Sequence, residues 1–370
     1  MTTVQSLLGR PVGWLAGKLA DDGSAENVNG GNDQREIVLS TRIRLARNLA
    51  DHRFRNGLTT VDQRSLVDHI DVMARQAIRW RDCLGFDLSH LGEIERTTLL
   101  ERRLISRDLV QADHPAALLT NPDQTHALMI NEEDHLRLQV LRPGLALIEA
   151  LEEAVALDRR LEEQLSWAVD SRYGYLTACP TNVGTGLRAS VMVHLPGLAE
   201  TDELPRALRG LTKLRLVARG LYGEGSDATG HFLQVSNQAT LGRSEEEITR
   251  QLADVVKRLI RYEGLARTQL LERRRSLIED RVFRAWGVLV YARRLTSKEL
   301  IEQLGWLRLG RGLGLLQHPN YDLIDELFLD GQPGHLQILY PAATAADLRD
   351  EVRATHVRQR LTEGTGSSAS

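Results

Sequence analysis

The sequence predicts an α+β protein in which a region of mixed strands and helices is followed by a smaller, all-helical one. From about Ile37 to Gly242, segments that alternate polar and apolar residues, as strands do, take turns with segments of helical spacing. After Gly242, apolar residues recur at helical spacing, and signals for helix starts divide the region. The fold class therefore follows from a change in the hydrophobic period along the chain.

Helix-start signals and one polar linker set the predicted boundaries. Ser-Glu-Glu-Glu at 244–247 is a capping box, in which Ser and Glu satisfy each other's orphan amides, and Thr-Ser-Lys-Glu at 296–299 repeats the signal. A weaker instance falls at 344–347. We expect an amino-terminal segment and linker at 1–35, a catalytic domain at 36–244, a helical domain at 245–361 and a disordered tail at 362–370.

Composition excludes several classes of protein. The 47 Lys and Arg nearly balance the 50 Asp and Glu, so a net charge of -3 predicts neither nucleic-acid binding nor attachment to an anionic membrane. The two cysteines, Cys83 and Cys179, are too few for a disulfide framework and fit a reducing compartment. The first 19 residues lack a cleavable signal, and no apolar run is long enough to span a bilayer. These observations predict a cytoplasmic protein.

Four strand-like segments carry arginines on their polar faces. They are 37–45 with Arg42 and Arg44, 135–140 with Arg137, 187–193 with Arg188, and 214–219 with Arg219. Any one of them alone is compatible with an ordinary solvated sheet face. Four repeats favour a polyanion bound among them, because like charges crowded on one face repel each other. Arginine suits phosphate, since its planar fork donates paired hydrogen bonds. The sequence thus predicts a triphosphate site, although it lacks a P-loop and the catalytic loop of protein kinases.

Acids and a cysteine lie near these arginines in the sequence. The acidic run at 131–134 precedes Arg137, and Glu224 follows Arg219 in a glycine-rich loop. Phosphate repels carboxylates, so these acids would hold a metal or receive a cationic substrate such as a guanidinium. Cys179 opens a loop with Pro180, Gly184 and Gly186, and its thiolate could hold a cationic nitrogen. Two ordinary interpretations stay open: an exposed acidic turn, and a cysteine that acts as a small buried hydrophobe.

Four motifs in the same order resemble the ATP:guanido phosphotransferase (phosphagen kinase) family. They are Ser-Thr-Arg-Ile-Arg at 40–44, Asn-Glu-Glu-Asp-His-Leu-Arg at 131–137, Cys-Pro-Thr-Asn-Val-Gly-Thr at 179–185 and Arg-Gly-Leu-Tyr-Gly-Glu at 219–224. The chain is most similar to the bacterial protein-arginine kinases of the McsB type. Like that branch, it has only about 35 residues before the strand that carries the first motif, a helical carboxy-terminal region, and an R-D-x-x-R-A sequence at 349–354.

The resemblance implies a fold and a set of site residues. The fold would be an antiparallel sheet flanked by helices, similar to glutamine synthetase, followed by an all-helical domain for dimerisation and phosphoarginine binding. Nucleotide contacts would come from Ser40, Thr41, Arg42, Ile43, Arg44, Arg137, Arg188, Ala189, Ser190, Val191, Met192, Arg219, Gly220, Leu221, Tyr222 and Gly223. Arg103 stands where the family's nucleotide-contacting histidine is expected. Catalytic roles would fall to Glu133, Glu224 and Cys179, and a regulatory phosphoarginine pocket to Arg349, Asp350, Arg353 and Ala354.

The implied activity is a protein-arginine kinase that transfers the γ-phosphoryl group of ATP to arginine side chains and is regulated allosterically. Magnesium would arrive with ATP, because no dedicated metal site is visible in the sequence. Protein substrates, an activator protein, a transcriptional repressor and protease-chaperone partners follow from the resemblance, with a role in stress response and quality control. We also expect a homodimer. Two alternatives remain: a metabolic kinase of free arginine, and a phosphoarginine-binding adaptor with weak kinase activity.

Overall fold

The computed structural model describes residues 3–8, 10, 12–13, 15, 34–78, 80, 82–220 and 228–363. Its contacts divide the chain into two compact units. The first comprises Met1–Trp14, Ser40–Ser190 and Ser236–Asp254, and the second comprises Leu15–Leu39, Val191–Val235 and Val255–Ser370. Among the helices of the described residues, none is both long and apolar enough to cross a bilayer.

The strands confirm the predicted α+β class. They are β1 (Val38–Arg47), β2 (Leu84–Asp87), β3 (Ala117–Thr120), β4 (His126–Ile130), β5 (Leu136–Pro143), β6 (Val169–Asp170), β7 (Gly174–Tyr175), β8 (Leu187–His194), β9 (Leu216–Gly220) and β10 (Phe232–Asn237). Eight of them form a sheet in the order β2-β3-β4-β5-β1-β8-β10-β9, and β6 pairs with β7 as a hairpin. The pairs that join β2, β3, β4, β5 and β1 are all antiparallel. Each strand-like segment identified from its arginines corresponds to one of these strands.

The helices are α1 (Gln5–Leu8), α2 (Gln34–Ile37), α3 (Thr60–Ile78), α4 (Glu93–Glu101), α5 (Arg107–Val110), α6 (Leu147–Glu162), α7 (Pro196–Glu200), α8 (Leu204–Lys213), α9 (Glu245–Tyr291), α10 (Ser297–Gly312), α11 (Tyr321–Asp330), α12 (Pro333–Leu339) and α13 (Ala346–Glu363). Short 3-10 turns are η1 (Arg55–Gly57), η2 (Leu88–His90), η3 (Pro180–Asn182) and η4 (Thr229–His231). Two predicted helix starts are confirmed: Ser244 and Glu247 exchange the hydrogen bonds of a capping box, and the Thr296 hydroxyl accepts from the Glu299 amide.

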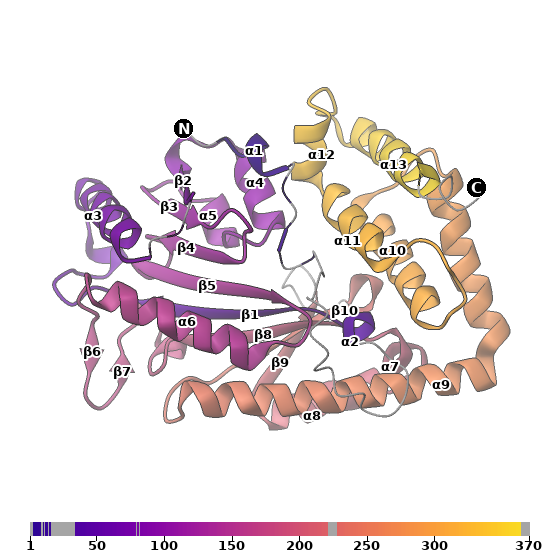
Figure 1. Cartoon of the computed structure of the whole chain (residues 1–370), viewed down its shortest axis with the longest axis horizontal. Helices are drawn as coiled ribbons and strands as arrows, with labels where there is room; N and C mark the ends of the chain where they lie inside the picture. Colours follow the sequence, from indigo (N-terminus) through magenta and orange to yellow (C-terminus); the bar gives the residue numbers. More distant parts are fainter. Residues whose placement is uncertain are drawn as a thin grey trace. The chain divides into compact units, whose positions relative to one another are not determined.

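In the first unit, helices α6 and α3 pack against the sheet. Figure 1 shows α6 lying along β5 and β1, with α3 beside it. The burial of β1 alternates in this region, because Ile43 and Leu45 are fully buried, whereas Arg42 and Arg44, which alternate with them, are only partly buried. One strand therefore supplies both the core and the polar face.

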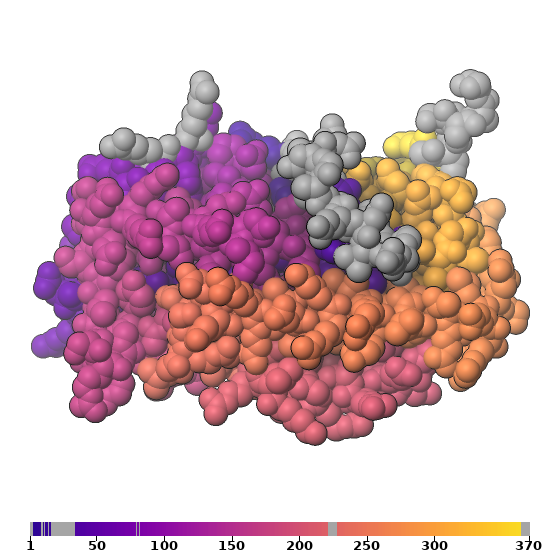
Figure 2. Space-filling view, turned by 60° about the horizontal axis from the view of Figure 1, so that its bottom comes forward, coloured from indigo at the N-terminus to yellow at the C-terminus, as the bar shows by residue number. Residues whose placement is uncertain are grey.

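In the second unit, the carboxy-terminal helices pack around a buried core to which Met192 of β8 and Phe232 of β10 also contribute. Residues of α9, α10, α11 and α13 pack together around side chains such as Leu304, Leu307 and Val357, all of which are fully buried. Gly305 and Gly230 allow α10 to approach η4, since a Cβ on Gly305 would lie 2.5 Å from the Gly230 carbonyl oxygen. The outer side of α9 is exposed (Figure 2), and the helix has one non-helical residue, Arg274.

Candidate active site

Arginines of the first unit gather on one face of its strands. The cluster consists of Arg42 and Arg44 on β1, Arg137 on β5, Arg188 on β8 and Arg103 after α4. We call these five residues the arginine cluster. In the antiparallel pair β1–β5, Arg44 lies opposite Gln139. The next residue on that face of β1, Ala46, lies opposite Arg137. Residues directly opposite each other point to the same side of a sheet, so the register brings Arg137 beside the arginines of β1.

Arg103 joins the cluster from a turn rather than from a strand. Its backbone adopts a left-handed conformation, with φ of 62°, just after α4 ends. The Gln139 side chain donates a hydrogen bond of 2.7 Å to the Arg103 carbonyl oxygen, and Gln139 belongs to the same face as Arg44. The structure thus holds Arg103 beside the arginines of β1, close enough for the charge of Arg42 to lower its pKa.

Burial first, and then the charges of neighbouring arginines, lowers the pKa values of three members of the cluster. Burial, followed by the charges of Arg188 and Arg137, lowers the pKa of Arg42 to about 10. Burial and then the neighbouring arginines, Arg42 first, also hold the pKa of Arg44 well below its ordinary value. Burial and Arg42 lower the pKa of Arg103 to about 9. The Nε of Arg44 is buried and has no hydrogen-bond partner among the described residues. Crowded, poorly solvated guanidinium groups form a site that an anion with several charges would stabilise.

The turn between β4 and β5 carries acids that differ in accessibility. The Glu132 side chain is fully buried; one of its oxygens lies 2.6 Å from Nη1 of Arg137, and the other accepts a hydrogen bond from the Glu133 amide. The Glu133 side chain is 40% exposed and lies 3.2 Å from Nη2 of Arg137. Burial and the neighbouring carboxylates raise the pKa of Glu133, while Arg137 opposes that increase. Glu133 is therefore an acid that a substrate can reach, and it accepts a proton more readily than an ordinary glutamate does.

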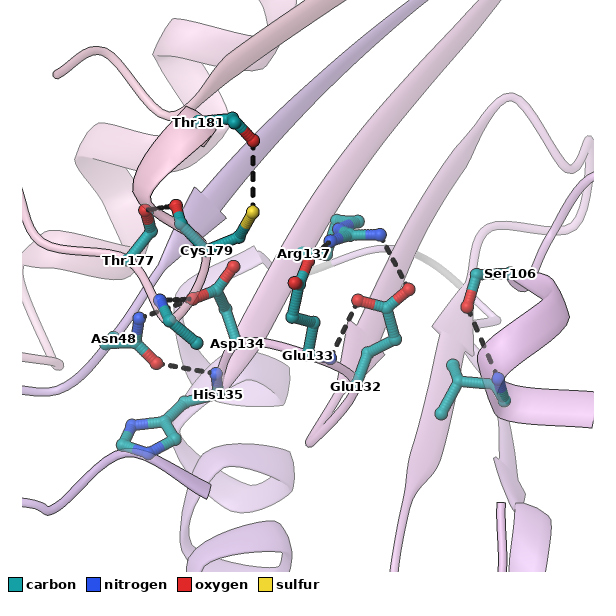
Figure 3. A network of polar contacts seen from close by, with 12 residues as sticks. Asn48, Ser106, Glu132, Glu133, Asp134, His135, Arg137, Thr177, Cys179 and Thr181 are labelled. Atoms are coloured by element: carbon teal, nitrogen blue, oxygen red, sulfur yellow. Dashed lines mark hydrogen bonds and ion pairs between the residues drawn. The ribbon is translucent and has the colours of Figure 1, made fainter. Parts of the chain in front are cut away.

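Cys179 lies beside this acidic turn (Figure 3). The backbone amide of the preceding residue, Ala178, donates a 2.7 Å hydrogen bond to Oδ1 of Asp134. The Cys179 thiol lies 3.0 Å from the Thr181 hydroxyl. The thiol and Glu133 are thus held on neighbouring segments of one unit.

The far end of the cysteine loop is fixed by a buried ion pair. Arg47, at the end of β1, lies 2.6 Å from Asp158 of α6 and donates a 3.0 Å hydrogen bond to the Thr185 carbonyl. Its guanidinium also covers the Tyr175 ring at 3.4 Å from the centroid. Gly186 adopts φ of 65°, and a Cβ there would lie 2.6 Å from the backbone carbonyl of the residue before Arg47. The loop is therefore anchored where it enters β8.

The remaining predicted nucleotide residues have varied surroundings. In the first unit, Thr41 is buried and donates to the Gly144 carbonyl, and Ser190 is buried beside β1. In the second unit, Met192 packs in the core, and Arg219 is exposed on β9. The predictions for Leu221, Tyr222, Gly223 and Glu224 fall outside the described residues.

The predicted regulatory residues lie on α13 in the second unit. Arg353 is 2% exposed, and its guanidinium donates to the carbonyls of Gly331 and Leu295, each at 2.7 Å, and to Asp350 at 2.6 Å. Arg349 is more accessible. The structure brings Asp350 and Arg353 together and gives Arg353 a role in linking helices.

Two residues that the sequence did not assign complete the acidic site. Asp134 belonged to the acidic run without a role of its own, and Asn48 carried no signal at all. Asn48 donates a 2.7 Å hydrogen bond to Asp134 although 86 positions separate them in the chain. Only the fold reveals that contact.

Known proteins share both halves of the chain. The family model for the ATP:guanido phosphotransferase C-terminal catalytic domain matches residues 73–266, which is more than half of the chain. The chain belongs to this kinase family. A second model, for the C-terminal domain of the protein-arginine kinase McsB, matches residues 275–370.

Individual relatives and solved structures agree with this assignment. A protein-arginine kinase of Halalkalibacterium halodurans is 44% identical over 88% of this chain and 92% of its own length. One from Brevibacillus brevis is 42% identical over 90% of this chain and 94% of its own. Among solved structures, lombricine kinase is 28% identical with a TM-score of 0.55, over 66% of this chain and 69% of that one. The duplicated taurocyamine kinase of Schistosoma mansoni is 25% identical with a TM-score of 0.55, over 61% of this chain and 33% of that one. The antiparallel sheet implied by the resemblance is therefore the fold of this kinase family.

Proposed function

We propose that this chain is a protein-arginine kinase, which transfers the γ-phosphoryl group of ATP to the guanidinium of arginine side chains in proteins. The observation that carries the proposal is one unit in which the arginine cluster lies beside an accessible acid, Glu133, and a cysteine, Cys179. The arginine cluster fits a triphosphate, and the acid with the thiol fits a guanidinium. The names of the relatives support protein arginine as the acceptor.

The guanidinium must lose a proton to act as a nucleophile, because its pKa lies far above neutral pH and its charged form has no free lone pair. Glu133 accepts that proton as a guanidinium nitrogen forms its bond to the γ-phosphorus. The bond from that phosphorus to the β,γ-bridging oxygen breaks, and ADP leaves with the electron pair. The arginine cluster offsets charge on the transferring group and on the leaving diphosphate.

Further residues and ligands belong to the same proposal. Cys179 faces one nitrogen of the guanidinium, and Glu224 holds its other edge. Magnesium accompanies ATP; no group of three or more His, Cys, Asp or Glu that could hold a metal ion occurs within the part of the chain that the structure describes. Phosphoarginine binds at Arg349 and its neighbours on α13 as a regulator. Protein substrates, an activator, a repressor and protease-chaperone partners in the cytoplasm, and a homodimeric state, complete the expected context.

The decisive test is Glu133→Gln, which keeps the shape of the side chain and removes its basicity. We expect the rate of phosphoryl transfer to fall by about 10²–10⁴-fold, the usual contribution of a general base, while ATP binding persists. The assay offers an unfolded protein and free arginine together with MgATP, and mass spectrometry under conditions that preserve P–N bonds identifies which acceptor is labelled.

The matched control is Glu162→Gln, an exposed glutamate at the end of α6 in the same unit, which should retain full activity. Undiminished labelling by the Glu133 variant would refute the mechanism. Labelling of free arginine in preference to the protein would instead identify a metabolic arginine kinase.

A further inference from the structure

Asp134 is a buried acid whose two oxygens have different surroundings. Its side chain is inaccessible to solvent, and Oδ1 accepts two hydrogen bonds of 2.7 Å, one from the Asn48 amide group and one from the Ala178 backbone. Oδ2 is buried and has no hydrogen-bond partner within the described part of the chain. Figure 3 shows the Asp134 side chain pointing toward the segment that carries Cys179. A carboxylate with one unsatisfied buried oxygen is costly, so its presence needs an explanation beyond stability.

Asn48 makes this acid the centre of a junction between three segments. Besides its bond to Asp134, the Asn48 amide group donates to the Leu176 carbonyl at 3.0 Å, and its oxygen accepts from the His135 amide at 2.9 Å. Asn48 directly follows β1, His135 ends the acidic turn, and Leu176 begins the cysteine loop. The end of β1, the acidic turn and the cysteine loop are therefore joined through two buried side chains.

Both proposed reacting groups belong to residues that are adjacent in sequence to this junction. Glu133 immediately precedes Asp134, and Cys179 immediately follows Ala178. One hydrogen bond, from the Ala178 amide to Asp134, thus fixes the separation between the backbones that carry the acid and the thiol. Catalysis by orientation is sensitive to such separations, since a misplacement of about 1 Å can cost about 10²-fold in rate. Burial also raises the pKa of Asp134, because its charged form is poorly solvated there.

We propose that Asp134 is a positioning residue, which holds the Cys179 loop against the Glu133 turn so that thiol and carboxylate meet the same guanidinium. The role rests on the proposed kinase function, but the anchor itself can be measured without any kinase activity. Asp134 acts through its neighbours and does not touch the substrate.

The experiment compares Asp134→Ala with Asp134→Asn in the full-length chain. Asparagine keeps the oxygen that accepts from Asn48 and Ala178, whereas alanine removes it. Hydrogen–deuterium exchange of the segment 176–183 reports the anchor, and kcat with the KM for ATP reports its effect on catalysis. For the alanine variant we expect exchange to be faster by about tenfold or more. We also expect kcat to be lower by about 10²-fold with the KM for ATP within about twofold. The asparagine variant should stay within about threefold of the unmodified chain in each measurement, because its acceptor oxygen is retained.

A matched control separates positioning from general loss of stability. Asp325→Ala removes another largely buried acid, one that lies 2.7 Å from Arg308 in the second unit, and should leave exchange of 176–183 unchanged. Should Asp134→Ala fail to fold, Asn48→Ala removes the other half of the junction and is expected to show the same pattern.

The proposal is overturned if the alanine variant keeps slow exchange in 176–183, or if faster exchange leaves kcat unchanged. It is also overturned if the asparagine variant loses as much activity as alanine, since the negative charge rather than the anchor would then matter. A chain that phosphorylates nothing before any substitution refutes the proposed function instead, and the exchange measurement then decides alone whether Asp134 anchors the loop.

Discussion

Replacing Arg42 by methionine should stabilise the nucleotide-free protein and weaken its binding of ATP. Arg42 is partly buried on β1. Burial and the charges of Arg188 and Arg137 destabilise its charged form and lower its pKa. Methionine has a similar length and can fill the same space without a charge. The two expected effects have opposite signs because the crowding that destabilises the empty site is relieved by a bound anion.

The magnitude follows from the pKa of Arg42, which is lowered to about 10. A decrease of this size corresponds to about 3 kcal/mol of penalty on the charged form. Solvent reduces that penalty, since Arg42 is not fully buried. We therefore expect the free energy of unfolding of the Arg42→Met variant to exceed that of the unmodified chain by about 1–2 kcal/mol. For a domain of this size, that gain raises the melting temperature by about 2–8 °C.

The assay is thermal and chemical unfolding of the chain with and without MgADP or a non-hydrolysable ATP analogue. Nucleotide should stabilise the unmodified chain by mass action and should stabilise the Arg42→Met variant less at the same concentration. The control is Arg64→Met, which removes an accessible arginine 2.7 Å from Asp87 and should change the unfolding free energy by no more than about 1 kcal/mol. Destabilisation of the empty protein by Arg42→Met, or an unchanged response to nucleotide, would show that the cluster is not a strained anion site.

Four further predictions concern other parts of the molecule. Because the pKa of Glu133 is raised and only its ionised form accepts a proton, kcat should decline with falling pH at higher pH than the ordinary glutamate value predicts, and a pH profile of kcat measures this. Gly305→Ala should lower the melting temperature, because the added Cβ would lie 2.5 Å from the Gly230 carbonyl oxygen; an unchanged melting temperature would mean that α10 can move away from η4. Arg353→Ala should destabilise the protein by about 3 kcal/mol or more, since it leaves Asp350 and two carbonyls without their buried partner. Arg349→Ala should leave stability unchanged and abolish binding of phosphoarginine, which calorimetry with the free amino acid measures.

The strands of the arginine cluster were predictable because their pattern is local. In 37–45, apolar and polar residues alternate with the period of a strand, so Arg42 and Arg44 had to share a face whatever the strand paired with. The register with β5, which places Arg137 on that face, depends on a pairing across about ninety positions. The residue pattern alone gave each strand its polar face, and the fold made the faces coincide.

Arg103 illustrates what the residue pattern could not supply. It lies in a turn with a left-handed backbone, where no periodicity exists, and it reaches the cluster because Gln139 holds its carbonyl. Only the resemblance to the kinase family indicated a nucleotide contact at this position. The starts of α9 and α10, in contrast, were predicted from capping residues alone, because a helix cap is formed by residues three positions apart.

The acidic turn shows most clearly why a sequence can locate a site without assigning its roles. Glu132, Glu133 and Asp134 are consecutive carboxylates, and residue type offers no way to rank them. The turn gives each a different environment: Glu132 is buried against Arg137, Glu133 is accessible, and Asp134 is buried against the cysteine loop. A general base must reach its substrate, so accessibility favours Glu133 as the proposed base, while the two buried acids contact Arg137 and the cysteine loop. For Asp134 to take the accessible position of Glu133, the turn would have to shift its register by one residue. That shift would break the hydrogen bonds that Asn48 and Ala178 donate to Asp134.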